Sequence, residues 1–390
     1  MNTLKYSARQ LLKNKWQILL VVFFAAIAVA LYLLVGQLGK KSENHINKSV
    51  SGVDIVVGAK GSPLQLVLSS LFFIDNPTGN ISVKEAAVWR KHPLVKESLP
   101  LSLGDNYAGN RLVGTEENYP SFLNLHLVEG VNFSKSFEAV VGAKVAAQLG
   151  ASLGDSFTSQ HGDSENGSSH DHPYTVVGIL ASCGCPFDNV IVVDAASFLE
   201  SHHMTPEQAE ISSLLIRGKT AMAKLQLPRM INENSKLQAA VPAIEADRLN
   251  QLSGGAFKLL ELFSYLFLAV CLLALLAAFM SRLRELLRDS AILQLSGFSR
   301  FFTIKLIFFE CFLLSLAGFL TGLLGYFIIS KWALAGLLKK YGLDGALALD
   351  AMDLTLAFIL VLSSAIIAAC VPSIKLLSMS LQKVISKEAY

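Results

Sequence analysis

The sequence predicts an α-helical membrane protein with four transmembrane helices and a large α+β extracytoplasmic domain. Composition is the first observation behind this prediction: 52% of the 390 residues are hydrophobic and only 16% are charged, whereas soluble domains carry about 25% charged residues. Second, four apolar segments are long enough to cross a bilayer, which takes about 20 residues. Third, the long stretch between the first two segments contains the short alternating runs that are typical of a folded domain.

The four predicted spans are almost free of charged residues. They are residues 16–36, 259–280, 306–330 and 354–376. The first could be read as a cleaved signal peptide, because AIAVA offers small residues for cleavage. However, its apolar run continues through LYLLVG, beyond the roughly 7–15 residues of a signal-peptide core. We therefore interpret it as an uncleaved anchor.

Lysine and arginine near the span ends predict the orientation. These residues gather in 1–15, which also has the pattern of an amphipathic helix, and in 281–302 and the tail 377–390. With four spans, all three segments lie on one side, which should be the cytoplasm. The short loop 331–353 is then outside; its three lysines oppose the rule and are balanced by Asp344, Asp350 and Asp353. We expect a multi-pass protein of the bacterial inner membrane with both termini in the cytoplasm.

Residues 37–258 would form the outside domain. Runs rich in β-branched residues predict strands at 53–58, 174–180, 189–193 and 212–218. Helical periodicity predicts helices at 82–92, 143–150 and 220–233, the last interrupted by Pro228. The polar composition of 159–172 predicts a mobile loop between strands.

Motifs that the sequence lacks disfavour several functions. It has no G-x-x-x-x-G-K-[S/T] phosphate-binding loop, so we do not expect this chain to hydrolyse ATP. No H-E-x-x-H motif is present, which disfavours a metalloprotease. The net charge of +3, without a basic run, disfavours a nucleic-acid partner. We expect that this chain is not an enzyme.

Histidines and cysteines gather in one part of the outside domain. The candidates for a weak Zn²⁺ or copper site are His161, His170, His172, Cys183 and Cys185, since imidazole and thiolate suit these metals. The alternative is a polar loop that is rich in histidine without binding a metal, and an outside cysteine pair that is free to oxidise. The sequence leaves both interpretations open.

Two features of the third span are candidates for a role within the membrane. Glu310 is either a functional intramembrane carboxylate or a residue near the headgroups. Gly318 and Gly322 form a G-x-x-x-G pattern, extended by Gly325, that would allow close helix packing.

The segment RDSAILQLSGFSRFFTIKLIFFE (288–310) resembles the cytoplasmic loop of MacB/FtsX/LolC-type ABC transporter permeases. Arg288, Ala291, Leu293, Gly297 and Glu310 fit that family's pattern, whereas Asp289–Ser290 departs from it, because the family more often has an acid directly before the alanine. The start of the outside domain (54–82) and the final span with its tail (371–385) resemble the same family, as does the order of one span, a large domain and three spans.

The resemblance implies a type VII ABC transporter with a MacB-like periplasmic core domain. A second permease chain, as homodimer or heterodimer, would pair with two ATPase chains, and ATP and Mg²⁺ would bind there, since this chain itself would bind no cofactor. The loop would be the coupling helix that contacts the ATPase, through Arg284, Arg288, Asp289, Ala291, Leu293 and Gly297. Periplasmic or outer-membrane components are further partners that the resemblance allows.

The function that follows is mechanotransmission: ATP hydrolysis by the partner would move the outside domain. The cargo would be a lipoprotein, lipid, peptide or small toxic molecule that is exported or extracted. The alternatives are FtsX-like signalling to a cell-wall hydrolase, a receptor without an ATPase, and a metal-linked transport role through the histidine-rich loop.

The orientation can be tested by labelling single cysteines introduced at Ser42, Ser164 and Ser299. We expect a membrane-impermeant reagent to label the first two positions from outside and to leave position 299 unlabelled, because 281–302 should be cytoplasmic. Labelling of position 299 in intact cells would overturn the orientation.

Overall fold

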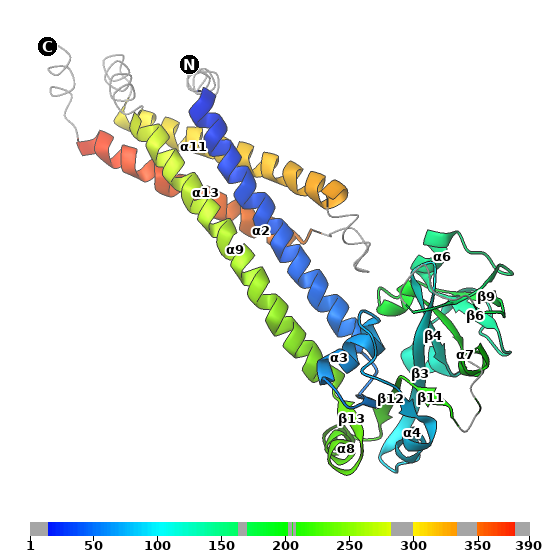
Figure 1. Ribbon diagram of the computed structural model, residues 1–390. Coiled ribbons are helices and arrows are strands. Elements are labelled where there is room, and N and C mark those ends of the chain that lie inside the picture. Colours follow the sequence, from blue (N-terminus) through cyan, green and yellow to red (C-terminus); the bar gives the residue numbers. More distant parts are fainter. Residues whose placement is uncertain are drawn as a thin grey trace. The chain divides into compact units, whose positions relative to one another are not determined.

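The computed structural model describes residues 15–162, 170–201, 205, 208–281, 299–333 and 349–378. The chain divides into two compact units. Unit 1 takes its described residues from 1–41, 253–338 and 345–390, and unit 2 takes them from 42–252. The divisions fall within the helices α2 (Lys15–Val50) and α9 (Pro242–Ser281), so each of these helices has residues in both units (Figure 1).

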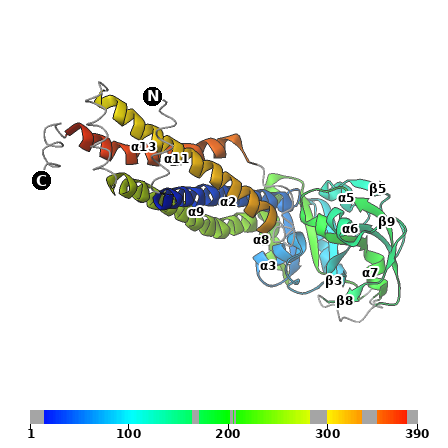
Figure 2. The same cartoon turned by 90° about the horizontal axis from the view of Figure 1, so that it is seen from above.

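Unit 1 is helical. It contains parts of α2 and α9, together with α11 (Arg300–Ile328), the π-helical turn η4 (Ile329–Ala333) and α13 (Ala351–Ser378). The helices α11 and α13 lie side by side (Figure 2). Among the described residues, four helices are long and apolar enough to cross a membrane: Ile18–Val50, Pro242–Ala278, Phe301–Trp332 and Ala351–Leu377. The predicted fold class is confirmed in this respect.

Two of these helices are longer than the apolar segments that predicted them. α2 does not end near Gly36 but continues to Val50, and α9 begins at Pro242 instead of near Leu259. The extension of α2 is polar, but it carries Ile46 and Val50 four residues apart on one helix face. Both residues contact the core of unit 2. Hydropathy alone would end the helix earlier in the sequence, but this tertiary packing extends it to Val50.

The predicted glycine pattern lies where α11 meets α2. A Cβ atom on Gly318 would lie 2.5 Å from the Cβ of Ala25, and one on Gly322 would lie 2.7 Å from the Cβ of Val29. At Gly325 the nearest atom, the Cβ of Ala30, would be at an ordinary 3.8 Å. Gly318 and Gly322 therefore permit the close approach of two helix backbones, whereas Gly325 adds little to it.

The described residues of unit 2 form a mixed sheet of eleven strands in the order β13-β1-β12-β3-β4-β10-β6-β9-β5, with β7 on β9 and β8 on β3. The strands are β1 (Ile55–Ala59), β3 (Val95–Tyr107), β4 (Asn110–Thr115), β5 (Leu127–Gly130), β6 (Glu138–Val141), β7 (Ser156–Phe157), β8 (Gln160–His161), β9 (Tyr174–Leu180), β10 (Val190–Asp194), β12 (Ser213–Gly218) and β13 (Leu237–Ala240). A separate pair joins β2 (Ile81–Ser82) to β11 (Glu210–Ile211).

Short helices cover the sheet. They are α3 (Pro63–Val67), η2 (Leu68–Phe72), α4 (Val83–Arg90), α5 (Tyr119–Leu123), α6 (Ala143–Leu149), η3 (Pro186–Asn189), α7 (Ala195–Ser201) and α8 (Ala221–Asn234). Successive side chains of β1 point to opposite faces of the sheet. Ile55 and Val57 therefore belong to the core beneath α4 and α8, while Val56 belongs to the core that includes α3 and α5.

The two long helices enter unit 2 at neighbouring strands. α2 leads into β1, and β13 leads into α9. β1 and β13 are antiparallel partners, with Val56 opposite Ala240. Ile46 and Val50 of α2 and Leu249 of α9 pack against the same buried core as Val56. The ends of both helices are therefore part of the folded domain.

The predicted elements of unit 2 are present with small shifts of boundary, and two predictions need correction. α8 runs through Pro228 without a break. Ala223, Leu227 and Ile231 on its inner face are fully buried and hold the helix against the core. Pro228 cannot donate a hydrogen bond to the carbonyl of Lys224, but Lys224 is exposed, so water can donate one instead. The segment predicted as a loop at 159–172 contains the strand β8, which pairs with β3. The predicted helix at 1–15 lies almost wholly outside the described residues, as does the tail from 379.

The contact between α11 and α2 predicts unequal effects of one substitution at two positions. We expect Gly322→Ala to lower the free energy of unfolding by about 1–3 kcal/mol, because the new methyl group meets Val29 and the backbone oxygen of Ala26. Gly325→Ala should be neutral or slightly stabilising. Thermal unfolding of the purified protein in detergent measures both, and equal effects would contradict the packing.

Candidate functional site

A polar cluster joins α2 to the start of α13 within unit 1. Asp353 accepts hydrogen bonds from Gln37 Nε2 at 2.6 Å and from Lys40 Nζ at 2.8 Å. Lys40 also contacts Asp350 Oδ2 at 3.1 Å. The Asp353 side chain is only 16% exposed, against 63% for Asp350. The hydrogen bonds and the ion pair of Asp353 are therefore less weakened by water than those of Asp350. The sequence suggested that these aspartates balance lysines of their own loop, whereas the structure pairs them with Lys40.

A cavity of about 260 Å³ lies beside this cluster, between α2, α9 and α13. Leu33, Val35 and Phe257 supply apolar wall, and Lys40, Lys258, Glu261 and Asp353 supply charges of both signs. Tyr265 donates a hydrogen bond to Glu261 Oε1 at 2.9 Å, which orients that carboxylate. The cavity can therefore accommodate a ligand that has both an apolar and a polar part.

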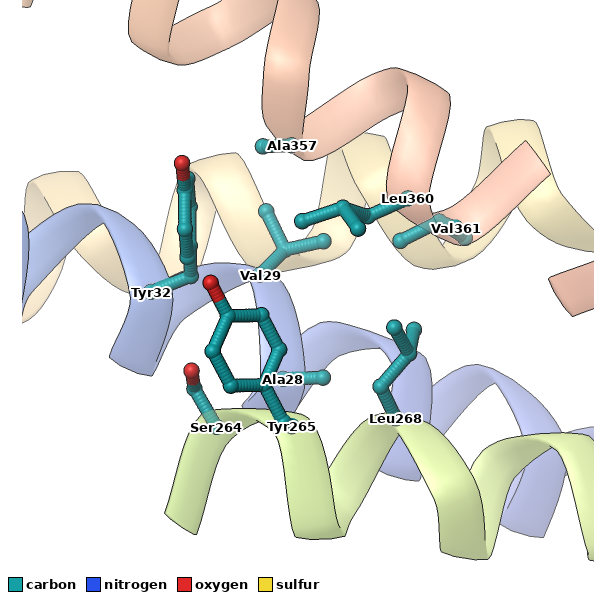
Figure 3. A pocket seen from close by; sticks show the side chains of 9 residues that line it. All are labelled: Ala28, Val29, Tyr32, Ser264, Tyr265, Leu268, Ala357, Leu360 and Val361. Carbon is teal, nitrogen blue, oxygen red and sulfur yellow. The ribbon is translucent and has the colours of Figure 1, made fainter. Parts of the chain in front are cut away.

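A second, smaller gap lies among the same three helices (Figure 3). Tyr32 and Tyr265 border it, with ring centroids 6.5 Å apart, and Leu268 and Val361 line its apolar part. Its volume of about 10 Å³ is near the space that one water molecule needs. This gap is a packing defect, whereas the cavity beside Lys40 and Asp353 is large enough for a ligand and has polar groups to bind one.

Glu310 lies in α11 and is 0% exposed. A carboxylate near the headgroups would be expected at the surface of the helical unit. Glu310 is therefore held within the helix packing, and its functional role stays a prediction.

The predicted coupling residues Arg284, Arg288, Asp289, Ala291, Leu293 and Gly297 lie outside the described residues. Their contact with an ATPase stays a prediction.

In unit 2, Asp105 lies between two of the predicted histidines. Its Oδ1 is 3.0 Å from His161 Nδ1, and its Oδ2 is 3.2 Å from His170 Nε2. The centroids of the two imidazole rings are 5.4 Å apart, and the ring planes are nearly perpendicular. Asp105 is on β3 and His161 on β8, at directly paired positions. One oxygen or nitrogen from each residue lies within 4.8 Å of the others, so the three could share a ligand.

Tyr174 borders the same region. Burial raises the pKa of Tyr174 to about 12, and the negative charge of Asp105 acts in the same direction. Its hydroxyl lies 3.3 Å from Ser201 Oγ. Tyr174 therefore stays protonated at neutral pH and adds no charge to the cluster.

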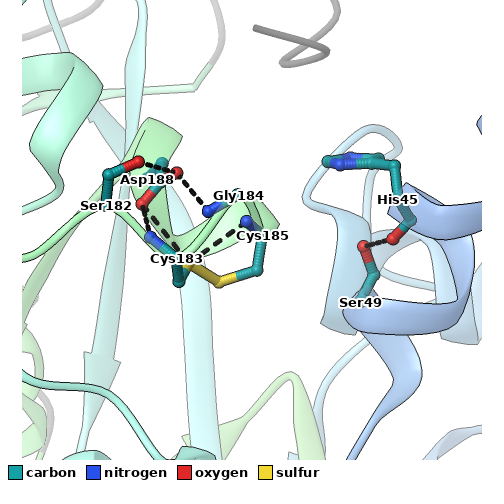
Figure 4. Close-up of a disulfide and its surroundings, with 7 residues drawn as sticks. All are labelled: His45, Ser49, Ser182, Cys183, Gly184, Cys185 and Asp188. Atoms are coloured by element: carbon teal, nitrogen blue, oxygen red, sulfur yellow. Dashed lines mark hydrogen bonds between the residues drawn. A yellow bond between two sulfur atoms is a disulfide. The ribbon is translucent and has the colours of Figure 1, made fainter. Parts of the chain in front are cut away.

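The remaining metal candidates lie apart from this cluster. His172 packs against Phe137, with ring centroids 5.0 Å apart. Cys183 and Cys185 are joined in a disulfide (Figure 4) and present no thiolate to a metal. Asp188 holds their turn by accepting hydrogen bonds at 2.9 Å from the backbone N–H groups of Cys183 and Gly184. Of the five candidate metal ligands taken from the sequence, the structure brings only His161 and His170 together, and it adds Asp105.

Reasoning from the sequence missed Asp105 and Lys40. Asp105 is a charge two residues after the end of the apolar run LPLSL, and a charge at a buried strand position was the available signal. Lys40 carried no comparable signal, because its partners lie more than 300 positions away in the sequence.

Residues 150–154, GASLG, match the G-x-S-x-G pattern of serine hydrolases. In such enzymes the serine sits on a turn from a strand into a helix. Here Ser152 follows the end of α6 and its backbone N–H donates to Asp155 Oδ2 at 2.7 Å. The context does not support a nucleophile.

Comparisons with known proteins agree with this architecture. The family described as MacB-like periplasmic core domain matches residues 18–227, and the family described as FtsX-like permease C-terminal matches residues 261–381. A search of curated proteins gave no match.

Two solved structures resemble the chain weakly. The periplasmic region of MacB from Actinobacillus actinomycetemcomitans is 13% identical with a TM-score of 0.36, and the match covers 54% of this chain and 97% of that one. The extracellular domain of the noncanonic ABC-type transporter YknZ from Gram-positive bacteria is 15% identical with a TM-score of 0.33, covering 47% and 98%.

The polar cluster of unit 1 predicts that its two aspartates differ in importance. We expect Asp353→Ala to lower the free energy of unfolding by about 1–2 kcal/mol, because a partly buried acceptor of two hydrogen bonds is lost. Asp350→Ala should change it by less than about 0.5 kcal/mol, as expected for an exposed ion pair. Thermal unfolding in detergent would contradict this ranking if both variants lost equal stability.

Proposed function

The chain belongs to the MacB/FtsX-type family of ABC transporter permeases, and from this premise we propose that it transmits the energy of ATP hydrolysis by a partner chain into movement of unit 2. In this proposal unit 2 lies outside the cytoplasm and both termini lie inside it. The substrate does not need to cross the membrane between the helices of unit 1, since the movement of unit 2 takes place outside the cytoplasm.

The observation that carries the proposal is the entry of α2 and α9 into unit 2 at paired strands. Each helix is unbroken across the division between the units. β1, which follows α2, and β13, which precedes α9, are hydrogen-bonded neighbours. A displacement of these two helices would therefore act on adjacent strands of one sheet.

The packing of the helix ends supports a stiff connection. Ile46 and Val50 of α2 and Leu249 of α9 lie against the buried core that includes Val56 and Leu215. Protein cores are close-packed and transmit strain instead of absorbing it. Without these contacts, the helices could tilt while the sheet stayed in place.

The partners follow from family membership. An ABC permease works with a cytoplasmic ATPase, and we propose that two ATPase chains bind ATP and Mg²⁺ while this chain pairs with a second permease. The loop 281–302 would contact the ATPase, with Arg284 and Arg288 providing polar contacts.

The cavity beside Lys40 and Asp353 supports a cargo with an apolar part and a charged or polar part. Its walls combine Leu33 and Phe257 with charges of both signs. Within the broader range of lipoproteins, lipids, peptides and small toxic molecules, we propose an amphiphilic molecule, since only such a cargo uses both kinds of wall.

Two insertions of equal length test the mechanical connection. Four glycines or four alanines are inserted between Lys41 and Ser42, where α2 passes from unit 1 to unit 2. Four residues add about one helical turn, but glycine disfavours helix by about 1 kcal/mol per residue relative to alanine. Spin labels at Ser136, an exposed position of unit 2, then report the distance between the two permease chains with and without ATP.

We expect an ATP-dependent change of this distance in the parent protein and in the alanine variant, and little or none in the glycine variant. Both insertions should leave the partner ATPase bound. Charge reversal by Arg284→Glu with Arg288→Glu should instead release the ATPase, because it alters the proposed contact itself. An unchanged response in the glycine variant would show that α2 does not carry the motion.

A further inference from the structure

We propose that Asp105, His161 and His170 form a binding site for a divalent transition-metal ion such as Zn²⁺. Two imidazole nitrogens and one carboxylate oxygen are a donor set that zinc accepts, and a water molecule or a ligand group can complete its four-coordinate shell. This site goes beyond the permease function and uses residues of unit 2 alone.

The distances between the donor atoms suit a shared ion. His161 Nδ1 and His170 Nε2 approach opposite oxygens of one carboxylate at 3.0 and 3.2 Å, and one donor atom from each residue lies within 4.8 Å of the other two. Ligands about 2.0–2.2 Å from a tetrahedral zinc ion lie roughly 3.3–3.6 Å apart. Side-chain movements on the order of 1 Å would therefore bring all three donors into range.

Burial decreases from one side of the cluster to the other. The side chain of Asp105 is 0% exposed, that of His170 is 14% exposed and that of His161 is 56% exposed. A carboxylate removed from water is costly unless positive charge compensates it, and a divalent ion bound at this position supplies such charge. The exposed side at His161 gives an ion access and leaves room for a water ligand.

The backbone holds the three residues in place. Asp105 and His161 are opposite each other in the antiparallel pair of β3 and β8. Gly162 donates from its backbone N–H to the Gly104 carbonyl at 2.9 Å, and His170 donates to the Ser159 carbonyl at 3.0 Å. These bonds fix both histidines relative to β3, so the donors are arranged before any ion arrives.

The same atoms could form a hydrogen-bonded triad without metal, in which a ring N–H of each histidine donates a hydrogen bond to Asp105. In the metal-bound form, lone pairs of the two imidazoles replace those donors and face the ion. The two states therefore compete for the same atoms, and a direct measurement of metal binding separates them.

The donor set also predicts selectivity. Mg²⁺ and Ca²⁺ bind mainly oxygen ligands, whereas imidazole favours zinc, copper and nickel. The site should therefore bind Zn²⁺ in the presence of excess Mg²⁺, and Co²⁺ should serve as a coloured substitute.

The test is calorimetric titration of Zn²⁺ into the full-length protein, purified in detergent, treated with a chelator and then freed of it. Mg²⁺ is present in excess throughout. We expect one saturable high-affinity equivalent per chain, with affinity about tenfold or more weaker in His161→Ala and in His170→Ala, since each removes a ligand. His172→Ala is the matched control, because His172 is only two residues from His170 in the sequence but packs on Phe137, outside the cluster, and the affinity of this variant should match the parent.

Asp105→Asn tests the third ligand, and His161→Ala keeps the test valid if that buried substitution impairs folding, because His161 is exposed. Circular dichroism of the metal-free variants checks their folding. Absorption of bound Co²⁺ should be present in the parent and in His172→Ala, and lost in His161→Ala. The proposal is overturned if the parent shows no saturable binding, if binding survives in the double variant His161→Ala with His170→Ala, or if His172→Ala weakens it equally.

Discussion

The structure depends on the packing of Ile46, Val50 and Leu249 against the core of unit 2. These three residues belong to helices whose other parts are apolar enough to cross a membrane. Each of these two helices is therefore suited to two environments. One part has apolar side chains that suit lipid, and the other part packs against a protein core. This double requirement explains why α2 and α9 are longer than a bilayer needs.

Unit 1 combines two kinds of contact that suit a membrane. Gly318 and Gly322 let α11 approach α2 closely, which matters because apolar side chains gain little by leaving lipid for one another. At the end of the helices, Lys40 and Asp353 supply a polar contact. Unit 1 thus has a close approach of two helix backbones in one region and charged side chains beside a cavity in another.

Much of this architecture could be predicted from the sequence. The four spans follow from uninterrupted apolar runs, and the strands at 174–180 and 212–218 follow from local residue preference. Helix ends were less predictable, because Val50 is set by a contact with a distant core and not by its neighbours. The predicted interruption at Pro228 was wrong for the same reason, because three residues buried in a core keep α8 intact.

The candidate sites show the same limit. His161 and His170 stood out by residue type, but Asp105 is more than 50 positions away in the sequence and meets them only through the pairing of β3 with β8. Lys40 and Asp353 likewise become partners only in the folded chain. Residue type can be read locally, whereas a site made by tertiary contacts cannot.

The pairing of β1 with β12 and β13 also sets the order in which unit 2 can fold during synthesis. β1 is made early, yet both of its partner strands come from residues 213–240. This end of the sheet must therefore wait until nearly the whole domain has been synthesised, and such distant pairings make folding slow. The apolar stretch of α9 follows directly, so the chain reaches its second membrane helix at about the moment when the domain first becomes able to close.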